Sequence, residues 1–389
     1  MIKRFTVTGF KSLERVHLEL GRVNVFVGAN GSGKSNLLEA LGVLGSAARG
    51  RVDDESLQRR GVRPGLPDRY RTAFTQAQLA ATIQFKASSH EASYDVGLYH
   101  RSEPDEPTWR YSTEKLTDKT KKIVGRSPAS LKKLDPAAGY AALKLVELDS
   151  SNAASQLLHR LEGYRIFSPT TPHLRGLVPD ESKSRPVGLS GGHLAEAVQD
   201  LLAGTSGAAL KRELLQLVEW AADVDVAPPE EANLSRSVPS PRSVVRFTDR
   251  FMADAHNHLS AYDASEGALY VMFAAVLALH PAAPRTLAID NVDHALNPRL
   301  ARALLSRFCG WVLSRPDTQV LLTAHNPVAL DELPLTNDSV RLFTVDRTTS
   351  GRTKVERVRI DERILALAQQ GLTLSRMWVM GLIGGVPNV

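Results

Sequence analysis

The chain has 389 residues, of which 43% are hydrophobic, and a formal net charge of +6. This length suits one large domain or two ordinary ones, and the apolar content excludes a globally disordered protein. The weak basic excess predicts either a solvated surface or a patch that contacts nucleic acid. The single cysteine, Cys309, excludes an intrachain disulfide and a cysteine-based zinc site, and its apolar surroundings predict a core residue.

Three short apolar segments, at 2–10, 16–20 and 23–27, open the chain and predict strands. No apolar block follows the first basic residues, so the opening does not read as a signal peptide. The longest apolar run, at 268–279, is too short to cross a bilayer and predicts a buried helix. We therefore expect a cytoplasmic protein that does not associate with a membrane.

A phosphate-binding pattern follows the third strand. Gly28–Ser35, GANGSGKS, matches GxxxxGK[ST], and a helix is predicted over 35–48. The glycines let backbone N–H groups turn toward phosphate oxygens, and the helix adds its positive N-terminal end. We expect Lys34 to neutralise the β and γ phosphates and Ser35 to ligate magnesium. The predicted ligands are ATP and Mg²⁺, and the predicted nucleotide-binding residues are Asn30, Gly31, Ser32, Gly33, Lys34 and Ser35.

The middle of the chain divides into two parts. Strand-like stretches at 79–86, 92–99 and 108–112 predict an antiparallel meander. Weak helical patterns and a lysine cluster over 113–160 then predict an inserted arm. Contact with DNA is one interpretation of the cluster, and a solvated face is the other. Its members are Lys115, Lys119, Lys121, Lys122, Lys132 and Lys133.

Helices and strands alternate again from residue 265. This alternation predicts a mainly parallel sheet with helices on both faces. The expected elements are helix 266–280, strand 286–290, helix 298–313 and strands 319–323 and 340–345. The expected units are an N-terminal lobe over 1–112, the arm over 113–241 and a C-terminal lobe over 242–389.

Asp290 ends the apolar strand of the segment RTLAIDNVDHALNP. A P-loop fold uses such an acid to hold magnesium, directly or through water. Asn291 follows, and an amide can orient water but cannot accept its proton. Asp293 and His294 are alternatives for that task.

His325 follows another apolar strand, VLLTA. We expect this strand to deliver the imidazole to the end of the sheet, near the γ-phosphate. There it would sense the phosphate or polarise the attacking water.

These motifs together resemble the SMC/RecF/OLD branch of the ABC-type ATPases. The resemblance covers about 1–48 and 262–346 and rests on GFKSL, VFVGANGSGKSNLLEAL, AIDNVDHALNP and TAHNPVALDEL. It implies an α/β P-loop NTPase of the ABC-type ATPase head class, with an antiparallel β subdomain and an inserted helical arm. ABC-type ATPases usually have a glutamate at the position of Asn291.

The resemblance also implies a signature loop that one protomer presents to the γ-phosphate held by the other. Ser265, Glu266 and Gly267 open an apolar helix upstream of Asp290 at a spacing that suits this branch. The sequence LSGG at Leu189–Gly192 is the alternative. A homodimer or higher oligomer follows from this arrangement.

The layout is most similar to short OLD-like ATPases of prokaryotic defence against phage. Such proteins often act beside a separately encoded nuclease or toxin, and we expect no Toprim nuclease domain after the ATPase core. We therefore expect an ATPase that regulates a partner effector, with DNA as a candidate partner. The alternative is an ATP-locked scaffold with little turnover. A transporter subunit is disfavoured by the GFKSL opening and by the inserted arm.

Three weaker signals remain. His256 and His258 beside Asp254 suggest either a metal site or a polar loop. Gln76 or Gln78 is expected to serve as the Q-loop glutamine. The C-terminal segment containing Met377, Trp378 and Met380 is expected to dock either on the chain's own core or on a partner or second copy, and packing on a partner or second copy is favoured.

Overall fold

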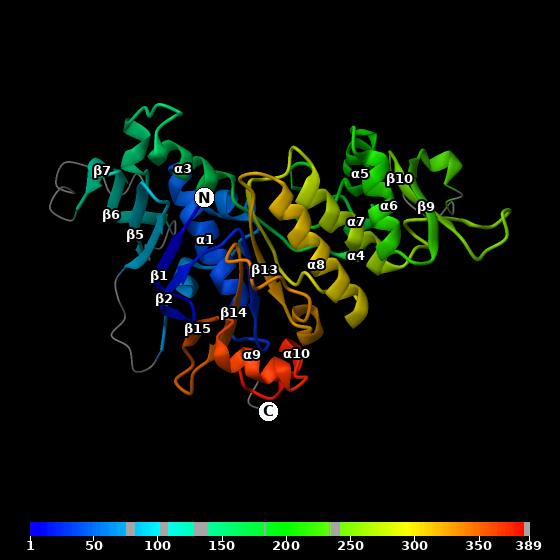
Figure 1. Cartoon of the computed structure of the whole chain (residues 1–389). Helices are drawn as coiled ribbons and strands as arrows, with labels where there is room; N and C mark the ends of the chain where they lie inside the picture. The colour runs from blue at the N-terminus through cyan, green and yellow to red at the C-terminus, as the bar shows by residue number, and fades with distance from the viewer. Residues whose placement is uncertain are drawn as a thin grey trace.

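The computed structural model describes residues 1–74, 82–101, 108–127, 139–182, 184–232, 234 and 242–384. It contains two six-stranded sheets and one three-stranded sheet. In Figure 1, the antiparallel sheet lies at one side, α1 lies beside it, and α7 and α8 lie on the opposite side of β13. The expected Gln76, Gln78, Lys132 and Lys133 lie outside the described residues.

The antiparallel sheet has the spatial order β2-β1-β4-β5-β6-β7. Its strands are β1 (Arg4–Phe10), β2 (Leu13–Glu19), β4 (Ile83–Ser88), β5 (Ala92–Arg101), β6 (Thr108–Asp118) and β7 (Lys121–Arg126). The predicted meander is therefore confirmed. The helical character predicted for 113–126 is wrong, because these residues continue the alternation of buried and exposed positions along β6 and β7.

The second sheet has the order β15-β14-β3-β13-β12-β8 and is parallel except for β15. Its strands are β3 (Val23–Val27), β8 (Arg165–Phe167), β12 (Thr286–Ile289), β13 (Gln319–Ala324), β14 (Val340–Arg347) and β15 (Thr353–Val358). The small sheet consists of β9 (Ala221–Ala227), β10 (Val244–Asp249) and β11 (His258–Ser260). Because β8 lies within the predicted arm and pairs with β12, the arm contributes a strand to the core sheet.

The helices lie in both halves of the chain. They are α1 (Lys34–Arg49), α2 (Asp54–Gln58), α3 (Ala153–Gly163), α4 (Thr171–Leu174), α5 (Leu194–Ala203), α6 (Gly207–Leu217), α7 (Glu266–Leu279), α8 (Pro298–Ser314), α9 (Glu362–Gln369) and α10 (Leu374–Val379). Short 3₁₀ segments are η1 (Pro67–Tyr70), η4 (Ala142–Leu145), η5 (Pro229–Glu231) and η6 (Pro327–Leu330). Within the described part of the chain, no helix combines the length and apolarity needed to cross a membrane.

The alternation of side chains along β3 separates two hydrophobic cores. Val23, Val25 and Val27 face the core that contains α7 and α8. Phe26 faces the other core, which lies between the parallel sheet, α1 and the antiparallel sheet. A strand with both faces buried presents its carboxyl end, and the loop that follows, at the rim of the sheet. The expected α/β class and mixed sheets are confirmed.

The predicted core role of Cys309 is confirmed, because its side chain is buried on α8. The expectation that the C-terminal segment packs on a partner is wrong for Met377 and Trp378. Both side chains are buried in the chain's own fold, and α10 contacts η6. Met380 is 61% exposed.

Candidate nucleotide-binding site

Adjacent parallel strands bring the predicted site residues together. β3 pairs with β13, and β13 pairs with β12, so their carboxyl ends meet at one edge of the sheet. The phosphate loop follows β3, His325 follows β13, and Asp290 follows β12. Ser35 Oγ lies 2.9 Å from Asp290 Oδ2 and 3.2 Å from Oδ1, although these residues are far apart in sequence.

The phosphate loop has the shape that an anion site requires. Gly31 and Gly33 have φ angles of +76° and +111°, which side-chain-bearing residues rarely adopt. No side chain caps the start of α1, so its first backbone N–H groups lack a side-chain acceptor. Lys34 Nζ donates to Gly28 O at 2.7 Å and to Ala29 O at 2.9 Å. Burial lowers the pKa of Lys34 to about 8, although Asp290 and Asp293 oppose this shift.

A buried hydroxyl cluster holds the loop from behind. Thr353 Oγ1, on β15, donates to Ser32 O at 2.7 Å and lies 2.7 Å from Ser12 Oγ. Ser12 Oγ also accepts from Asn36 Nδ2 at 2.8 Å. A Cβ added at Gly33 would lie 2.2 Å from Thr353 Oγ1. This role of Thr353 was not predicted from the sequence, because nothing local in the sequence places β15 beside the phosphate loop.

A buried carboxylate connects the GFKSL segment to α1. Glu39 is 3% exposed and forms ion pairs with Lys11 and Arg63. Burial lowers the pKa of Lys11, while the hydrogen bond to Glu39 raises the pKa of Arg63. Asp290 also raises the pKa of Arg63, which places this guanidinium in the electrostatic field of the site. The single acid within the apolar part of α1 was the sequence signal for this contact.

Thr323 positions the acid that ends β12. Its Oγ1 donates to Asp290 Oδ1 at 2.5 Å and accepts from Asn291 N at 2.7 Å. Asn291 has a φ of +58°, in the left-handed region that asparagine tolerates better than most residues. The backbone of the acidic segment is therefore bent at the residue that follows Asp290.

His325 and Asn291 form a direct pair, with His325 Nε2 2.7 Å from Asn291 Oδ1. The amide oxygen only accepts hydrogen bonds, so this contact requires the proton on Nε2. Burial, aided by Lys34, lowers the pKa of His325, while Asp293 and Asp290 oppose the shift. The imidazole is therefore neutral near pH 7 and holds the asparagine side chain at the sheet edge.

Two residues weighed as substitutes for the missing glutamate have other contacts. Asp293 Oδ2 accepts from His325 N at 2.8 Å and from Asn326 N. This carboxylate therefore fixes the turn after β13. The His294 ring lies 5.7 Å from the Tyr270 ring on α7 and is exposed.

The end of β8 lies at the same site and was not predicted from the sequence. Asp290 N donates to Phe167 O at 2.9 Å, and exposed Ser168 follows at the same edge of the sheet. β8 has only three residues, which is too short for periodicity to reveal.

The two signature candidates differ in exposure. Ser265 precedes α7, is exposed and makes no capping hydrogen bond, while Gly267 packs against Leu296 and Leu300. Among the described residues, no hydrogen bond joins Ser265, Glu266 or Gly267 to the phosphate loop of the same chain.

The alternative, Leu189–Gly192, forms a partly buried turn around the Asp180 carboxylate. Asp180 Oδ2 accepts from Ser190 N at 2.9 Å and from Gly192 N at 3.2 Å. This turn therefore has a structural role in the core next to α5.

The His256–His258 segment lies before and within β11. His258 Nδ1 lies 3.3 Å from Thr248 Oγ1, and Asn257 donates to Asp254 at 3.4 Å. In the described ranges, no group of three or more His, Cys, Asp or Glu side chains is arranged to hold a metal ion. These contacts favour the polar-loop interpretation.

The residues at the sheet edge fit a magnesium–nucleotide complex. Mg²⁺ prefers oxygen ligands, which the Ser35 hydroxyl and the Asp290 carboxylate provide side by side. The glycine-rich turn, the uncapped start of α1 and Lys34 provide donors for phosphate oxygens.

Two curated relatives share short stretches with the chain. The DNA replication and repair protein RecF of Paenarthrobacter aurescens is 33% identical over 105 residues, covering 26% of this chain and 25% of that protein. The RecF protein of Renibacterium salmoninarum is 44% identical over 55 residues, covering 14% of each chain. The chain thus matches a quarter or less of either relative.

Solved structures share the fold over nearly the whole chain. The Smc head bound to the C-winged helix domain of ScpA is 14% identical, with a TM-score of 0.51, and the match covers 93% of this chain and 99% of that one. A Pyrococcus furiosus Smc head with an extended coiled coil, bound to the C-terminal domain of ScpA, is 12% identical. Its TM-score is 0.51, and the match covers 95% of this chain and 99% of that one.

A family model matches residues 23–186 and 196–331, which include the phosphate loop, Asp290 and His325. Together with the SMC-type head fold and the short RecF matches, this supports an SMC/RecF-like ABC-type ATPase. The chain belongs to the family described as "AAA domain, putative AbiEii toxin, Type IV TA system".

Proposed function

We propose that the protein binds and hydrolyses MgATP as a head-to-head dimer, and that this cycle regulates a separately encoded effector in antiviral defence or DNA transactions. The observation that carries the proposal is the convergence of Lys34, Ser35, Asp290 and His325 at one edge of the sheet. Lys34 binds the β and γ phosphates, and Ser35 and Asp290 hold the metal, which supplies positive charge beside the phosphates.

The dimer completes the site in this proposal. Exposed Ser265 and the start of α7 would meet the γ-phosphate held by a second copy. Support comes from the exposure of Ser265, from the lack of a hydrogen bond between this segment and the chain's own phosphate loop among the described residues, and from a hollow of about 360 Å³ that Ser265 and Asn297 line together.

Turnover without the usual glutamate would depend on the Asn291–His325 pair. Asn291 orients the attacking water, and the neutral imidazole fixes the asparagine. Because neither group is a strong base, we expect slow hydrolysis.

The decisive test is steady-state ATP turnover of the purified protein beside Lys34→Ala, with and without DNA. Turnover that Lys34→Ala abolishes supports the proposal, and stimulation by DNA favours the role in DNA transactions. Absence of MgATP binding by the folded wild-type protein would contradict the whole proposal.

The alternative is an ATP-held scaffold that keeps an effector bound and releases it on a trigger. Asn291 is the observation that favours it, because an amide cannot take the proton of water. Tight MgATP binding with no turnover, alone or with DNA, would select this alternative.

A further inference from the structure

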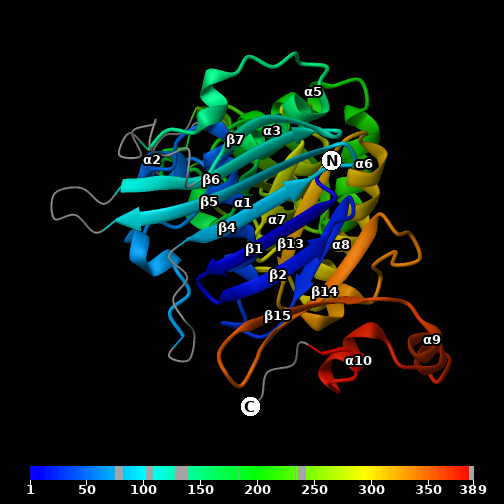
Figure 2. The same cartoon turned by 90° about the vertical axis from the view of Figure 1, so that its left-hand side faces the viewer.

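A buried arginine lies where α1, α2 and the end of α3 meet. Arg60 follows α2, its side chain is 0% exposed, and its backbone oxygen accepts from Ile166 N on β8 at 2.8 Å. α1 contacts both α2 and α3, and Figure 2 shows α1 and α3 behind β5 and β6 of the antiparallel sheet. The pairing with β8 therefore fixes Arg60 against the core sheet.

The guanidinium of Arg60 has only backbone partners. Nη1 donates to Ser56 O at 2.9 Å, and Nη2 donates to Glu162 O at 3.1 Å. Nε is buried and has no hydrogen-bond partner among the described residues. In the same part of the chain, no carboxylate lies within ion-pair distance of Arg60. A buried charge in this state is costly, because neutral carbonyls replace only part of its lost hydration.

Three further arginines add positive charge around Arg60. Burial lowers the pKa of Arg60 to about 9, Arg165, Arg49 and Arg59 add to this shift, and Glu162 opposes it. Burial, Arg49 and Arg59 also lower the pKa of Arg165. Because each guanidinium disfavours the charge of its neighbours, these side chains lie within one electropositive region. We call Arg49, Arg59, Arg60 and Arg165 the arginine cluster.

The acids beside the arginine cluster are engaged elsewhere. Glu55 forms an ion pair with Arg59 one helical turn away. Asp53 lies 3.3 Å from Arg51 and caps α2 by accepting from Ser56 N at 2.8 Å. Both carboxylates are therefore held by other groups and leave the charge of Arg60 without a counterion.

Two other members of the cluster also lack a carboxylate partner. Arg165 Nη1 donates to Glu162 O and Tyr164 O, both at 2.8 Å. Arg49 is exposed in the last turn of α1 and makes no hydrogen bond or ion pair within the described ranges. Its guanidinium is thus available to a ligand, and Arg60 supplies a buried charge beside it.

A hollow of about 190 Å³ opens over the cluster, and Arg49, Arg59 and Arg60 line it. This volume is below the range of about 300–1,000 Å³ that is typical of sites for drug-sized ligands. It suits a small anion or the charged end of a small molecule. The planar fork of guanidinium donors matches the oxygens of a phosphate group.

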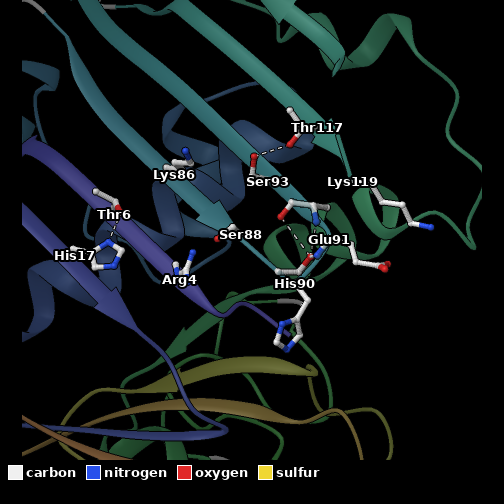
Figure 3. A pocket seen from close by; sticks show the side chains of 12 residues that line it. Arg4, Thr6, His17, Lys86, Ser88, His90, Glu91, Ser93, Thr117 and Lys119 are labelled. Carbon is white, nitrogen blue, oxygen red and sulfur yellow. Dashed lines mark hydrogen bonds between the residues drawn. The ribbon is translucent and has the colours of Figure 1, made fainter. Parts of the chain in front are cut away.

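A larger hollow on the exposed face of the antiparallel sheet lacks this imbalance of charge. Figure 3 shows Arg4 and Lys86 along it. Arg4 lies 3.9 Å from Glu19, Lys86 lies 3.9 Å from Asp95, and both cations are more than half exposed. Water and carboxylates neutralise these charges, so the buried Arg60 is the stronger indication of an anion.

We propose that the arginine cluster binds a small phosphate-bearing molecule in the hollow between α1 and α2, through Arg49 and Arg60. The bound phosphate supplies the counterion that Arg60 lacks and reduces the repulsion within the cluster. Lys34 and Arg49 are the first and last residues of α1, so the site lies about 22 Å from the phosphate loop along the helix. The inference goes beyond the proposed function and does not depend on ATP turnover.

The test is isothermal titration calorimetry of the full chain with inorganic phosphate at constant ionic strength. Saturating Mg²⁺ and the non-hydrolysable analogue AMP-PNP fill the phosphate loop, so that added phosphate reports on other sites. A second titration uses glycerol 3-phosphate, a phosphate monoester.

Arg49→Gln is the test variant, because Arg60→Gln would also remove the contacts to Ser56 O and Glu162 O and destabilise the fold. Arg212→Gln is the matched control, because Arg212 is an exposed helical arginine on α6 that bonds only to a carbonyl of its own helix. Circular dichroism and thermal melting show that both variants are folded.

We expect the wild type and Arg212→Gln to bind phosphate with similar Kd, and Arg49→Gln to bind at least about tenfold more weakly. Binding of both probes identifies a phosphorylated small molecule, binding of inorganic phosphate alone identifies the free ion, and either result supports the site. Absence of phosphate binding by the wild type, or equal affinity in Arg49→Gln, would overturn the proposal. Failure of AMP-PNP to bind contradicts the proposed function alone, since the comparison with Arg49→Gln still locates the phosphate.

Discussion

At the scale of single residues, the protonation of Lys34 sets how nucleotide binding depends on pH. Burial lowers its pKa to about 8, so the ammonium is charged at pH 7 and mostly neutral at pH 9. MgATP binds the charged form, so its Kd should rise by about tenfold between pH 7 and 9. Isothermal titration calorimetry measures this change. Lys34→Arg keeps its charge and should bind with little pH dependence; an equal dependence in this variant would show that another group titrates.

Asn291 is the second residue whose chemistry is testable. Asn291→Glu places a carboxylate where ABC-type ATPases usually carry one, and general-base catalysis should raise kcat by about 100-fold. The left-handed φ of +58° at this position makes the substitution cost about 1 kcal/mol of stability. Turnover assays with Asn291→Gln as the amide control check the prediction. Equal rates in the two variants would remove Asn291 from its assigned role.

At the scale of elements, the β14–β15 hairpin braces the phosphate loop. Thr353→Val keeps the shape of the side chain and removes the hydroxyl that satisfies Ser32 O and contacts Ser12. We expect a loss of about 1–3 kcal/mol in unfolding free energy and weaker MgATP binding. Thr353→Ser should restore most of both.

Thr348→Val is the matched control, because this threonine lies on the same hairpin and is exposed. Denaturant unfolding and nucleotide titration provide the two readouts. If Thr353→Val and Thr348→Val behave alike, the hydroxyl cluster has no special role in holding the loop.

At the scale of the whole molecule, the proposed dimer predicts complementation between two inactive variants. Lys34→Ala disables the phosphate loop, and Ser265→Arg disables the segment presented to the other copy. A mixed dimer retains one intact composite site out of two. In an equal mixture, half of the dimers are mixed, so we expect about one quarter of wild-type turnover. If the mixture shows no turnover at any mixing ratio, although both variants are folded and mixed dimers form, the complete site lies within one chain.

Several parts of the site followed from the sequence because local physics fixes them. The spacing of Gly28, Gly33, Lys34 and Ser35 directly sets the backbone shape and the anion-binding helix start. The apolar strands before Asp290 and His325 predicted that both residues emerge at the sheet edge. The error over 113–126 arose because charged outward positions of β6 and β7 concealed a strand alternation whose apolar half is buried in the core, where β6 contacts α3 and β7 contacts η4.

The sequence by itself determined the phosphate loop, the α/β class, the acid and histidine at the ends of strands, and the buried helix α7. Only the tertiary structure decided that Thr353 supports the loop, that β8 lies beside β12, and that Glu39 pairs with Lys11 and Arg63. The physical reason is the distance along the chain over which each effect acts. Propensity, periodicity and turn chemistry act over a few neighbouring residues, whereas these contacts join segments through strand order and burial, which are settled only when the two cores pack.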